Sequence, residues 1–205
     1  MSYLILVRHG QSKWNLENRF TGWVDVDLTQ NGKLEAEKAG ILIKKTNIKI
    51  DYYFSSFQLR ANHTLKIIQQ ILNDEKKFIK AWELNERHYG GLTGLNKIEM
   101  GQKIGEKRVL QFRRSWDLRP DPLDKKSKFH PLNIDSYKNI PKEKIPDTES
   151  LKDTYDRVVN YYLLEIKNKI KKGNILISAH GNSIRALCKF LFKLDEKQIS
   201  ELEIP

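Results

Sequence analysis

Three short apolar runs recur along the chain, each followed by polar or turn-forming residues. They occupy residues 3–7, 51–54 and 174–178 and are rich in β-branched or aromatic side chains. Runs of this length and composition are typical of buried strands. Because amphipathic stretches separate them, the pattern predicts an α/β fold, with a mostly parallel central sheet between two helical layers in an α/β/α arrangement.

Charged and potentially catalytic residues follow each of these strands. Arg8, His9 and Gly10 come directly after the first strand, Arg60 comes shortly after the second, and His180 comes after the third. In open parallel sheets, ligands bind outside the carboxyl ends of the strands. If the strands are neighbours, two imidazoles and two guanidinium groups surround one point. That set suits an anionic phosphoryl group better than a metal ion.

Helical periodicity is visible in four segments, at residues 28–45, 58–72, 147–166 and 183–192. A further strand is predicted at residues 78–84 because apolar side chains gather there. In the first helix, the buried stripe is predicted to consist of four residues: Leu34, Ala39, Leu42 and Ile43.

A long polar connection, residues 11–28, follows the first strand, and loops of this length inside compact domains are often binding loops. Asn15, Thr21 and Gly22 are its candidate ligand contacts, through an amide, a hydroxyl and an exposed backbone N–H. Three aromatic residues of the connection are interpreted as anchors to the core: Trp14, Phe20 and Trp23.

Residues 90–147 depart from the alternation of strands and helices. Two predicted helices, at 97–104 and 107–117, precede a lysine-rich stretch punctuated by proline. We interpret the region as an insertion within a single domain spanning residues 1–205, and we expect it to act as a lid beside the sheet edge. Its lysine-rich part, residues 124–144, is expected to be less ordered than its surroundings.

Composition and charge narrow the function classes. The net charge is +11, from 37 basic and 26 acidic residues, so nucleic-acid binding has to be considered. The excess lysines are scattered, however, which is typical of a solvated surface, and a basic nucleic-acid-binding module is a remote alternative. Cys188 is the single cysteine, the apolar run before Arg8 is too short for a signal peptide, and no run has membrane-spanning length. These features favour a cytoplasmic protein without a membrane partner.

The residues at the sheet edge predict phosphoryl transfer through a histidine. A neutral ring nitrogen of His9 can attack phosphorus and form a phosphohistidine. Arg8, Arg60 and His180 would stabilise the charge on the transferring oxygens, and Glu86 would give and retrieve the proton. No metal is required, because positive groups already neutralise the charge and the sequence has no zinc-binding motif.

Several segments together carry a recognisable pattern. They are Leu-Val-Arg-His-Gly-Gln-Ser at 6–12, Trp-Asn at 14–15, Phe-Thr-Gly-Trp at 20–23, Asp-Leu-Thr at 27–29, Glu-Arg-His-Tyr-Gly at 86–90, Gly-Leu-Asn-Lys at 94–97, Arg-Arg-Ser-Trp-Asp at 113–117 and Ser-Ala-His-Gly-Asn-Ser at 178–183. The first of them resembles the signature of the histidine phosphatase superfamily. The ordered set resembles the cofactor-dependent phosphoglycerate mutases over nearly the whole chain.

The resemblance implies interconversion of 3-phosphoglycerate and 2-phosphoglycerate in glycolysis and gluconeogenesis, primed by 2,3-bisphosphoglycerate and without a metal. It implies that His9 carries the phosphoryl group, that His180 stabilises it in transfer, and that Glu86 is the proton donor and acceptor. By the same resemblance, further residues would contact the phosphates or the carboxylate: Arg8, Gly10, Ser12, Asn15, Thr21, Gly22, Arg60, Arg87, His88, Tyr89, Lys97, Arg113, Arg114, Gly181 and Asn182.

One alternative shares this chemistry: a phosphomonoesterase, in which water takes the phosphoryl group from His9. A mutase has to retain a doubly phosphorylated intermediate, and the extra cations suit that retention: Arg87, Lys97, Arg113 and Arg114. The resemblance also implies a homodimer or homotetramer. Members of the family usually continue beyond the position of Pro205 into a further strand and a tail near the site entrance, and this sequence does not include them.

Overall fold

A parallel sheet lies at the centre of the computed structural model, which describes residues 2–205 and contains four strands within them. In sheet order these are β1 (Leu4–Arg8), β4 (Ile175–Ala179), β2 (Tyr52–Ser55) and β3 (Ile79–Lys80). The last strand in the sequence therefore lies between the first two. Arg8 is opposite Ala179 in the register, which confirms that His9 and His180 leave the sheet side by side.

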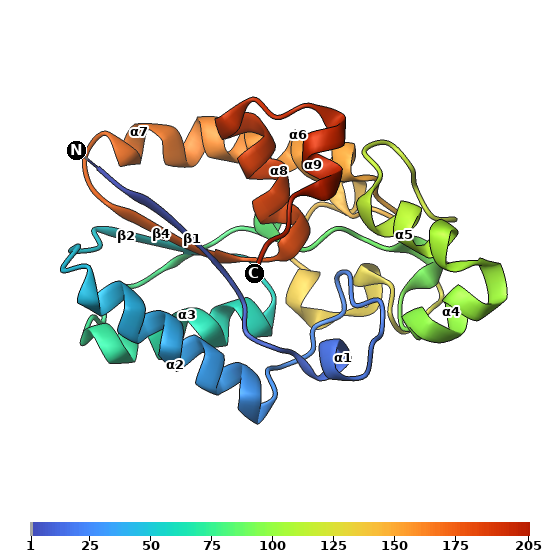
Figure 1. Cartoon of the computed structure of the whole chain (residues 1–205), viewed down its shortest axis with the longest axis horizontal. Coiled ribbons are helices and arrows are strands. Elements are labelled where there is room, and N and C mark those ends of the chain that lie inside the picture. Colours follow the sequence, from blue (N-terminus) through green and yellow to red (C-terminus); the bar gives the residue numbers. More distant parts are fainter. Residues whose placement is uncertain (1) are drawn as a thin grey trace.

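Helices cover both faces of the sheet, as Figure 1 shows, so the predicted three-layer arrangement is confirmed. One layer consists of α2 (Gln30–Lys45) and α3 (Leu59–Leu72). The opposite layer contains α6 (Leu151–Tyr161), a π-helical turn (Tyr162–Ile166), α7 (Lys167–Ile170), α8 (Gly181–Phe192) and α9 (Glu196–Glu201). None of the helices in residues 2–205 is long and apolar enough to cross a membrane.

The central strand β4 shows why both faces need a cover. Ile175 and Ile177 belong to the apolar cluster beneath α6 and α8, whereas Leu176 packs with Leu65 and Ile68 of α3. Successive side chains of a strand point to opposite faces, so a strand that is apolar throughout has to be buried on both.

The predicted stripe of α2 is wrong in two positions. Ile43 is buried, but Leu34 and Leu42 are 45% and 64% exposed. The buried positions are instead small ones, including Ala36 and Gly40. A β-carbon at Gly40 would press on α3, so the two helices pack more closely than large apolar side chains allow.

The strand predicted at residues 78–84 is also mostly wrong. Only Ile79–Lys80 pairs with β2, and the chain then turns into a 3₁₀ helix, Trp82–Leu84. Leu84 is fully buried in the cluster that includes α6. Burial of this side chain against a helix accounts for the apolar run that had suggested a longer strand.

The region between residues 90 and 147 forms helices and short turns. The helices α4 (Lys97–Ile104) and α5 (Glu106–Arg114) lie near the predicted positions. Further 3₁₀ helices are Gly90–Leu92, Pro131–Asn133, Asp135–Tyr137 and Lys142–Lys144. The lid role and the boundaries of this region stay predictions.

The lysine-rich part of this region packs against the connection that follows β1. Tyr137 and Ile140 are buried with Trp23, and the Tyr137 hydroxyl donates a hydrogen bond to the Trp23 carbonyl oxygen. Phe20 and Trp23 are fully buried, which confirms two of the predicted aromatic anchors, whereas Trp14 is half-buried. The connection also contains a short helix, α1 (Lys13–Leu16).

Candidate active site

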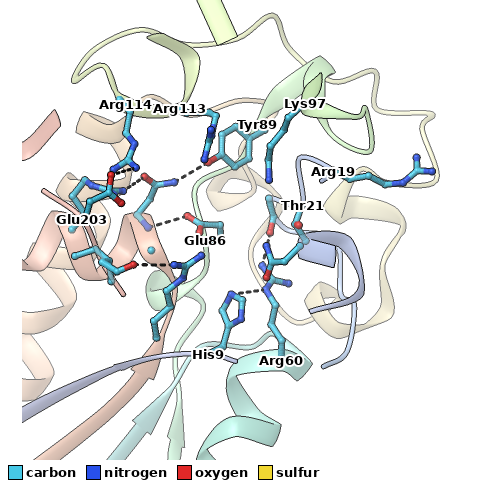
Figure 2. Close-up of a pocket in the computed structure, with 17 residues that line it drawn as sticks. His9, Arg19, Thr21, Arg60, Glu86, Tyr89, Lys97, Arg113, Arg114 and Glu203 are labelled. Carbon is cyan, nitrogen blue, oxygen red and sulfur yellow. Dashed lines mark hydrogen bonds and ion pairs between the residues drawn. The ribbon is translucent and has the colours of Figure 1, made fainter. Parts of the chain in front are cut away.

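A polar cavity of about 160 Å³ opens at the carboxyl ends of the strands (Figure 2). β1 delivers His9 to it, and the first turn of α3 delivers Arg60. The lining residues are Arg8, His9, Asn15, Arg19, Thr21, Gly22, Arg60, Glu86, Tyr89, Lys97, Arg113, Arg114, Gly181, Asn182, Arg185, Glu203 and Ile204. Cations far outnumber carboxylates in this set, so the cavity fits an anionic ligand.

His9 is held as a neutral ring with one unprotonated nitrogen. Its Nδ1 lies 2.7 Å from the Gly10 carbonyl oxygen, which can only accept, so Nδ1 carries the proton. Burial, followed by the positive charge of Arg60, holds the pKa of His9 well below its usual range. The lone pair therefore resides on Nε2, to which the Arg60 Nε–H donates at 3.2 Å. An unprotonated Nε2 is the form of histidine that can attack phosphorus.

His180 lies beside His9, with 4.9 Å between the two ring centroids. Its Nε2 is hydrogen-bonded to the Ser56 hydroxyl at 2.8 Å, and the side chain is completely buried. Burial and the charge of Arg60 hold the pKa of His180 well below its usual range. The second imidazole is thus fixed within reach of a group carried by the first.

Arg60 connects the histidines to the loop after β1. Its guanidinium donates to the Gly22 and Val24 carbonyl oxygens, both at 3.0 Å. Gly22 has φ 53°, and a β-carbon there would lie 3.2 Å from the Tyr89 nitrogen, so glycine is needed for this backbone geometry. Arg60 stands in the first turn of α3, where its positive charge opposes the helix dipole. A bound anion would compensate both the guanidinium and the positive end of the helix dipole.

Glu86 supplies a carboxylate to the same cavity, where Figure 2 shows its side chain among the cations. Its Oε1 accepts from the backbone N–H of Arg87 at 2.7 Å and from that of Asn182 at 3.3 Å. The side-chain amide of Asn182 donates a separate hydrogen bond to the Tyr89 hydroxyl at 3.0 Å. The carboxylate is therefore oriented by two backbone N–H groups, that of Arg87 and that of Asn182 at the start of α8, rather than by a salt bridge, which leaves it available for proton transfer.

Four cations from helices surround the outer part of the cavity: Lys97 of α4, Arg113 and Arg114 of α5, and Arg185 of α8. Burial and the neighbouring charge of Arg113 lower the pKa of Lys97 to about 8. Glu203 pairs with Arg114 at 2.6 Å. Most of this positive charge has no carboxylate partner in the described part of the chain, which favours binding of a multiply charged anion.

Most of the predicted site residues are brought together, but some do not line this cavity. Gly10 lines a neighbouring cavity instead, and His180 does not line this one, although its ring adjoins that of His9. Arg87 is fully buried with its guanidinium 4.8 Å from the Tyr89 ring centre, and none of the guanidinium nitrogens has a hydrogen-bond partner within residues 2–205. A buried charge left in this way is costly unless an anion reaches it.

Ser12 and His88 are placed away from the cavity. The Ser12 hydroxyl caps α1 and bonds to the Asn15 side chain, so it orients a lining residue. His88 is buried near Trp23 and His130, and burial lowers its pKa to about 3. The polar neighbours of His88 in the sequence predict a site residue, but its ring points into the packed interior.

Four lining residues were not predicted: Arg19, Arg185, Glu203 and Ile204. Arg185 could have been found, because it lies one helical turn after Asn182 and donates to that side chain at 2.8 Å. Nothing in the sequence signals that Ile204 lies at the cavity. Its carbonyl oxygen accepts a hydrogen bond at 2.9 Å from Arg8, which is near the other end of the chain. No cluster of three or more potential metal ligands occurs among residues 2–205.

Comparison with known proteins gives two consistent findings. The profile of the Histidine phosphatase superfamily (branch 1) matches residues 4–130 and 122–205. A 2,3-bisphosphoglycerate-dependent phosphoglycerate mutase of Pelagibacter ubique is 69% identical over 206 residues, which cover 100% of this chain and 87% of that protein. The protein of the same name from Borreliella afzelii is 49% identical, with 100% and 84% covered.

Solved structures share the fold. A mycobacterial glucosyl-3-phosphoglycerate phosphatase has a TM-score of 0.73 at 21% identity, covering 99% of this chain and 88% of that one. A structure titled mycobacterial hydrolase 1 has a TM-score of 0.72 at 21% identity, covering 99% of this chain and 84% of that one. Identities this low support the architecture and not the activity. On the sequence matches, the chain belongs to the histidine phosphatase superfamily and, within it, to the family of 2,3-bisphosphoglycerate-dependent phosphoglycerate mutases.

Proposed function

We propose that this protein is a 2,3-bisphosphoglycerate-dependent phosphoglycerate mutase. It interconverts 3-phosphoglycerate and 2-phosphoglycerate in glycolysis and gluconeogenesis through a phosphohistidine on His9. The observation that carries the proposal is the unprotonated Nε2 of His9, which lies in a cation-lined cavity beside Arg60 and His180. The names of the close relatives support the same reaction.

The reaction begins with attack of the His9 Nε2 lone pair on a phosphorus atom. A nitrogen–phosphorus bond forms while the bond to the leaving oxygen breaks, and the Glu86 carboxyl gives its proton to that oxygen. In the reverse half, the Glu86 carboxylate takes the proton of the incoming hydroxyl, and the electron pair returns to Nε2. Arg8, Arg60 and His180 stabilise the charge on the transferring oxygens.

The remaining groups suit a ligand with two phosphates and a carboxylate. The Thr21 hydroxyl lines the cavity, buried without a partner in the described chain, and the outer cations Lys97, Arg113 and Arg114 line it too. The Arg87 guanidinium, which is also buried without a hydrogen-bond partner there, lies against the ring of the lining residue Tyr89. 2,3-Bisphosphoglycerate fits such a donor set, and when bound it supplies the phosphoryl group that primes His9. We also propose substrate contacts for the other predicted residues that line the cavity, Asn15, Gly22, Tyr89, Gly181 and Asn182.

The alternative activity is that of a phosphomonoesterase, and the ratio of 2-phosphoglycerate to inorganic phosphate among the products distinguishes it from a mutase. The protein is given 3-phosphoglycerate with a trace of 2,3-bisphosphoglycerate, and 2-phosphoglycerate and inorganic phosphate are both measured. We expect 2-phosphoglycerate to form much faster than phosphate, because the cations retain the doubly phosphorylated intermediate. Release of phosphate without 2-phosphoglycerate would identify a phosphatase instead.

We further propose a homodimer or homotetramer that works in the cytoplasm, with no nucleic-acid or membrane partner. The family resemblance supports the oligomer, and the phosphoglycerate substrates support the compartment. Sedimentation at micromolar concentration tests the oligomer, since a single species of the mass of one chain would contradict it. Binding to a DNA fragment that weakens steeply with salt would contradict the absence of a nucleic-acid partner.

A further inference from the structure

A buried ion pair lies outside the cavity, between Arg157 of α6 and Glu149 just before that helix. Their side chains are only 9% and 4% exposed. The contact is bidentate, with Nε to Oε1 at 2.7 Å and Nη2 to Oε2 at 2.9 Å. A buried pair of this kind is stable only when further hydrogen bonds satisfy its remaining atoms.

Those further bonds all go to the backbone of one segment. The Arg157 guanidinium donates to the carbonyl oxygens of Glu83 at 2.6 Å, Asn85 at 2.9 Å and Glu86 at 3.0 Å. The Glu149 carboxylate accepts from the His88 N–H at 2.8 Å, and the Glu149 N–H donates to the His88 carbonyl oxygen at 3.0 Å.

The segment held in this way carries the proposed proton donor. Residues 85–89 have neither helical nor strand structure, so regular backbone hydrogen bonds do not hold them. The Gln58 side chain accepts from the Glu86 N–H at 2.9 Å, while the ion pair holds the Glu86 carbonyl and its flanking residues. The Arg157 guanidinium thus supplies the hydrogen bonds to backbone carbonyl oxygens that a neighbouring strand supplies within a sheet.

We propose that Arg157 and Glu149 are positioning residues that fix where Glu86 delivers its proton. The proposal rests on the proposed function, because it concerns the step in which the Glu86 proton passes to the leaving oxygen as its bond to phosphorus breaks. Catalysis of this kind depends on geometry, and a shift of about 1 Å in a positioned group costs about a hundredfold in rate. The ion pair acts through Glu86 and touches no reacting atom.

The test uses Arg157→Lys, which keeps the charge but loses the planar fork, and Glu149→Gln, which keeps the shape but loses the charge. The matched control is Arg119→Lys. Arg119 also makes a two-bond contact with a carboxylate of α6, that of Asp153, but on the surface and without a hydrogen bond to residues 83–88. Circular dichroism and thermal melts select the conditions under which each variant is folded, and Glu149→Gln carries the test if Arg157→Lys does not fold.

The readout is the rate of His9 phosphorylation from two donors. 2,3-Bisphosphoglycerate loses an alkoxide, which needs the Glu86 proton, whereas 4-nitrophenyl phosphate loses a stable phenolate, which does not. In both variants we expect phosphorylation by bisphosphoglycerate to slow by about 30–100-fold, with its half-saturating concentration changed by less than about threefold. Phosphorylation by 4-nitrophenyl phosphate should change by less than about threefold, and the control should match the wild type with both donors.

Equal slowing with both donors would overturn the proposal, since the ion pair would then merely support the fold around His9. Unchanged rates with bisphosphoglycerate would overturn it as well. Labelling of the wild-type protein distinguishes failure of the positioning role from failure of the proposed function. If bisphosphoglycerate does not label wild-type His9, the mutase assignment falls; if it labels the wild type and the variants equally well, only the positioning role falls.

Discussion

The floor and the rim of the cavity are built differently. What we call the floor consists of His9, Arg60 and Glu86, together with His180, whose ring adjoins that of His9. Backbone groups or a buried hydroxyl hold these four side chains. The rim consists of Lys97, Arg113, Arg114 and Arg185, which project from helices outside the sheet, as Figure 2 shows for three of them. In the proposed function, the floor would perform the chemistry and the rim would retain the charged ligand.

The two regions also differ in how their charge is compensated. Arg60 of the floor donates to carbonyl oxygens and to His9, so a bound phosphoryl group can be its anion. Arg114 of the rim, in contrast, already pairs with a carboxylate, that of Glu203. Substitutions in the floor should therefore reduce kcat, whereas substitutions in the rim should mainly raise KM.

The largest of the expected effects comes from Glu86→Gln in the floor. The amide keeps the shape of the carboxylate but cannot supply or take the proton, so kcat should fall by about 10²–10⁴-fold, with KM changed by less than about threefold. Steady-state turnover of 3-phosphoglycerate measures both constants. Glu83→Gln is the control, because that side chain belongs to the same segment without lining the cavity as residues 2–205 form it. Unchanged turnover in Glu86→Gln would remove Glu86 from the mechanism.

A smaller effect is expected from Arg113→Gln in the rim. Loss of one charge-assisted contact of about 1.5–3 kcal/mol should raise KM by about 10–100-fold and leave kcat within about threefold. Arg108→Gln is the control on the same helix, since Arg108 stacks on Phe112. A fall in kcat at unchanged KM would break the division between floor and rim.

The smallest effect is a pH dependence from Lys97, whose pKa is lowered to about 8 by burial and by Arg113. Below that pH the free enzyme has a charged ammonium to attract the substrate, and above it the charge is lost. Between pH 7 and 9, kcat/KM should therefore fall by up to about tenfold. Lys97→Arg stays charged throughout and should flatten the profile. An identical alkaline fall in Lys97→Arg would assign the titration to another group.

The floor could be predicted from the sequence to a large extent, because it depends on local pattern. Apolar runs located the strands, and the residues directly after them, His9 and His180, had to meet once the strands were parallel neighbours. The same logic failed at residues 78–84, where burial of Leu84 against a helix produced the apolar signal. It also failed on α2, because glycine and alanine, rather than leucine, fill its contact with α3.

The supports of the site were harder to predict, because they are contacts between distant segments. Glu149 precedes α6 and Arg157 lies in the middle of it, and their bonds to residues 83–88 exist only in the folded chain. Glu203 reaches Arg114 in the same way. His88 shows the opposite case, since its sequence neighbours suggest a site residue while packing turns its ring inward.

The central claim is that Nε2 of His9 carries the phosphoryl group, and its most direct test is the position of the label. The protein is treated with labelled 2,3-bisphosphoglycerate, and phosphorus NMR together with peptide mapping identifies the modified nitrogen. We predict an acid-labile, base-stable phosphoryl group on Nε2 of His9, and none in His9→Ala. Label on Nδ1 of His9, label on His180, or no label on the wild-type protein would contradict the account.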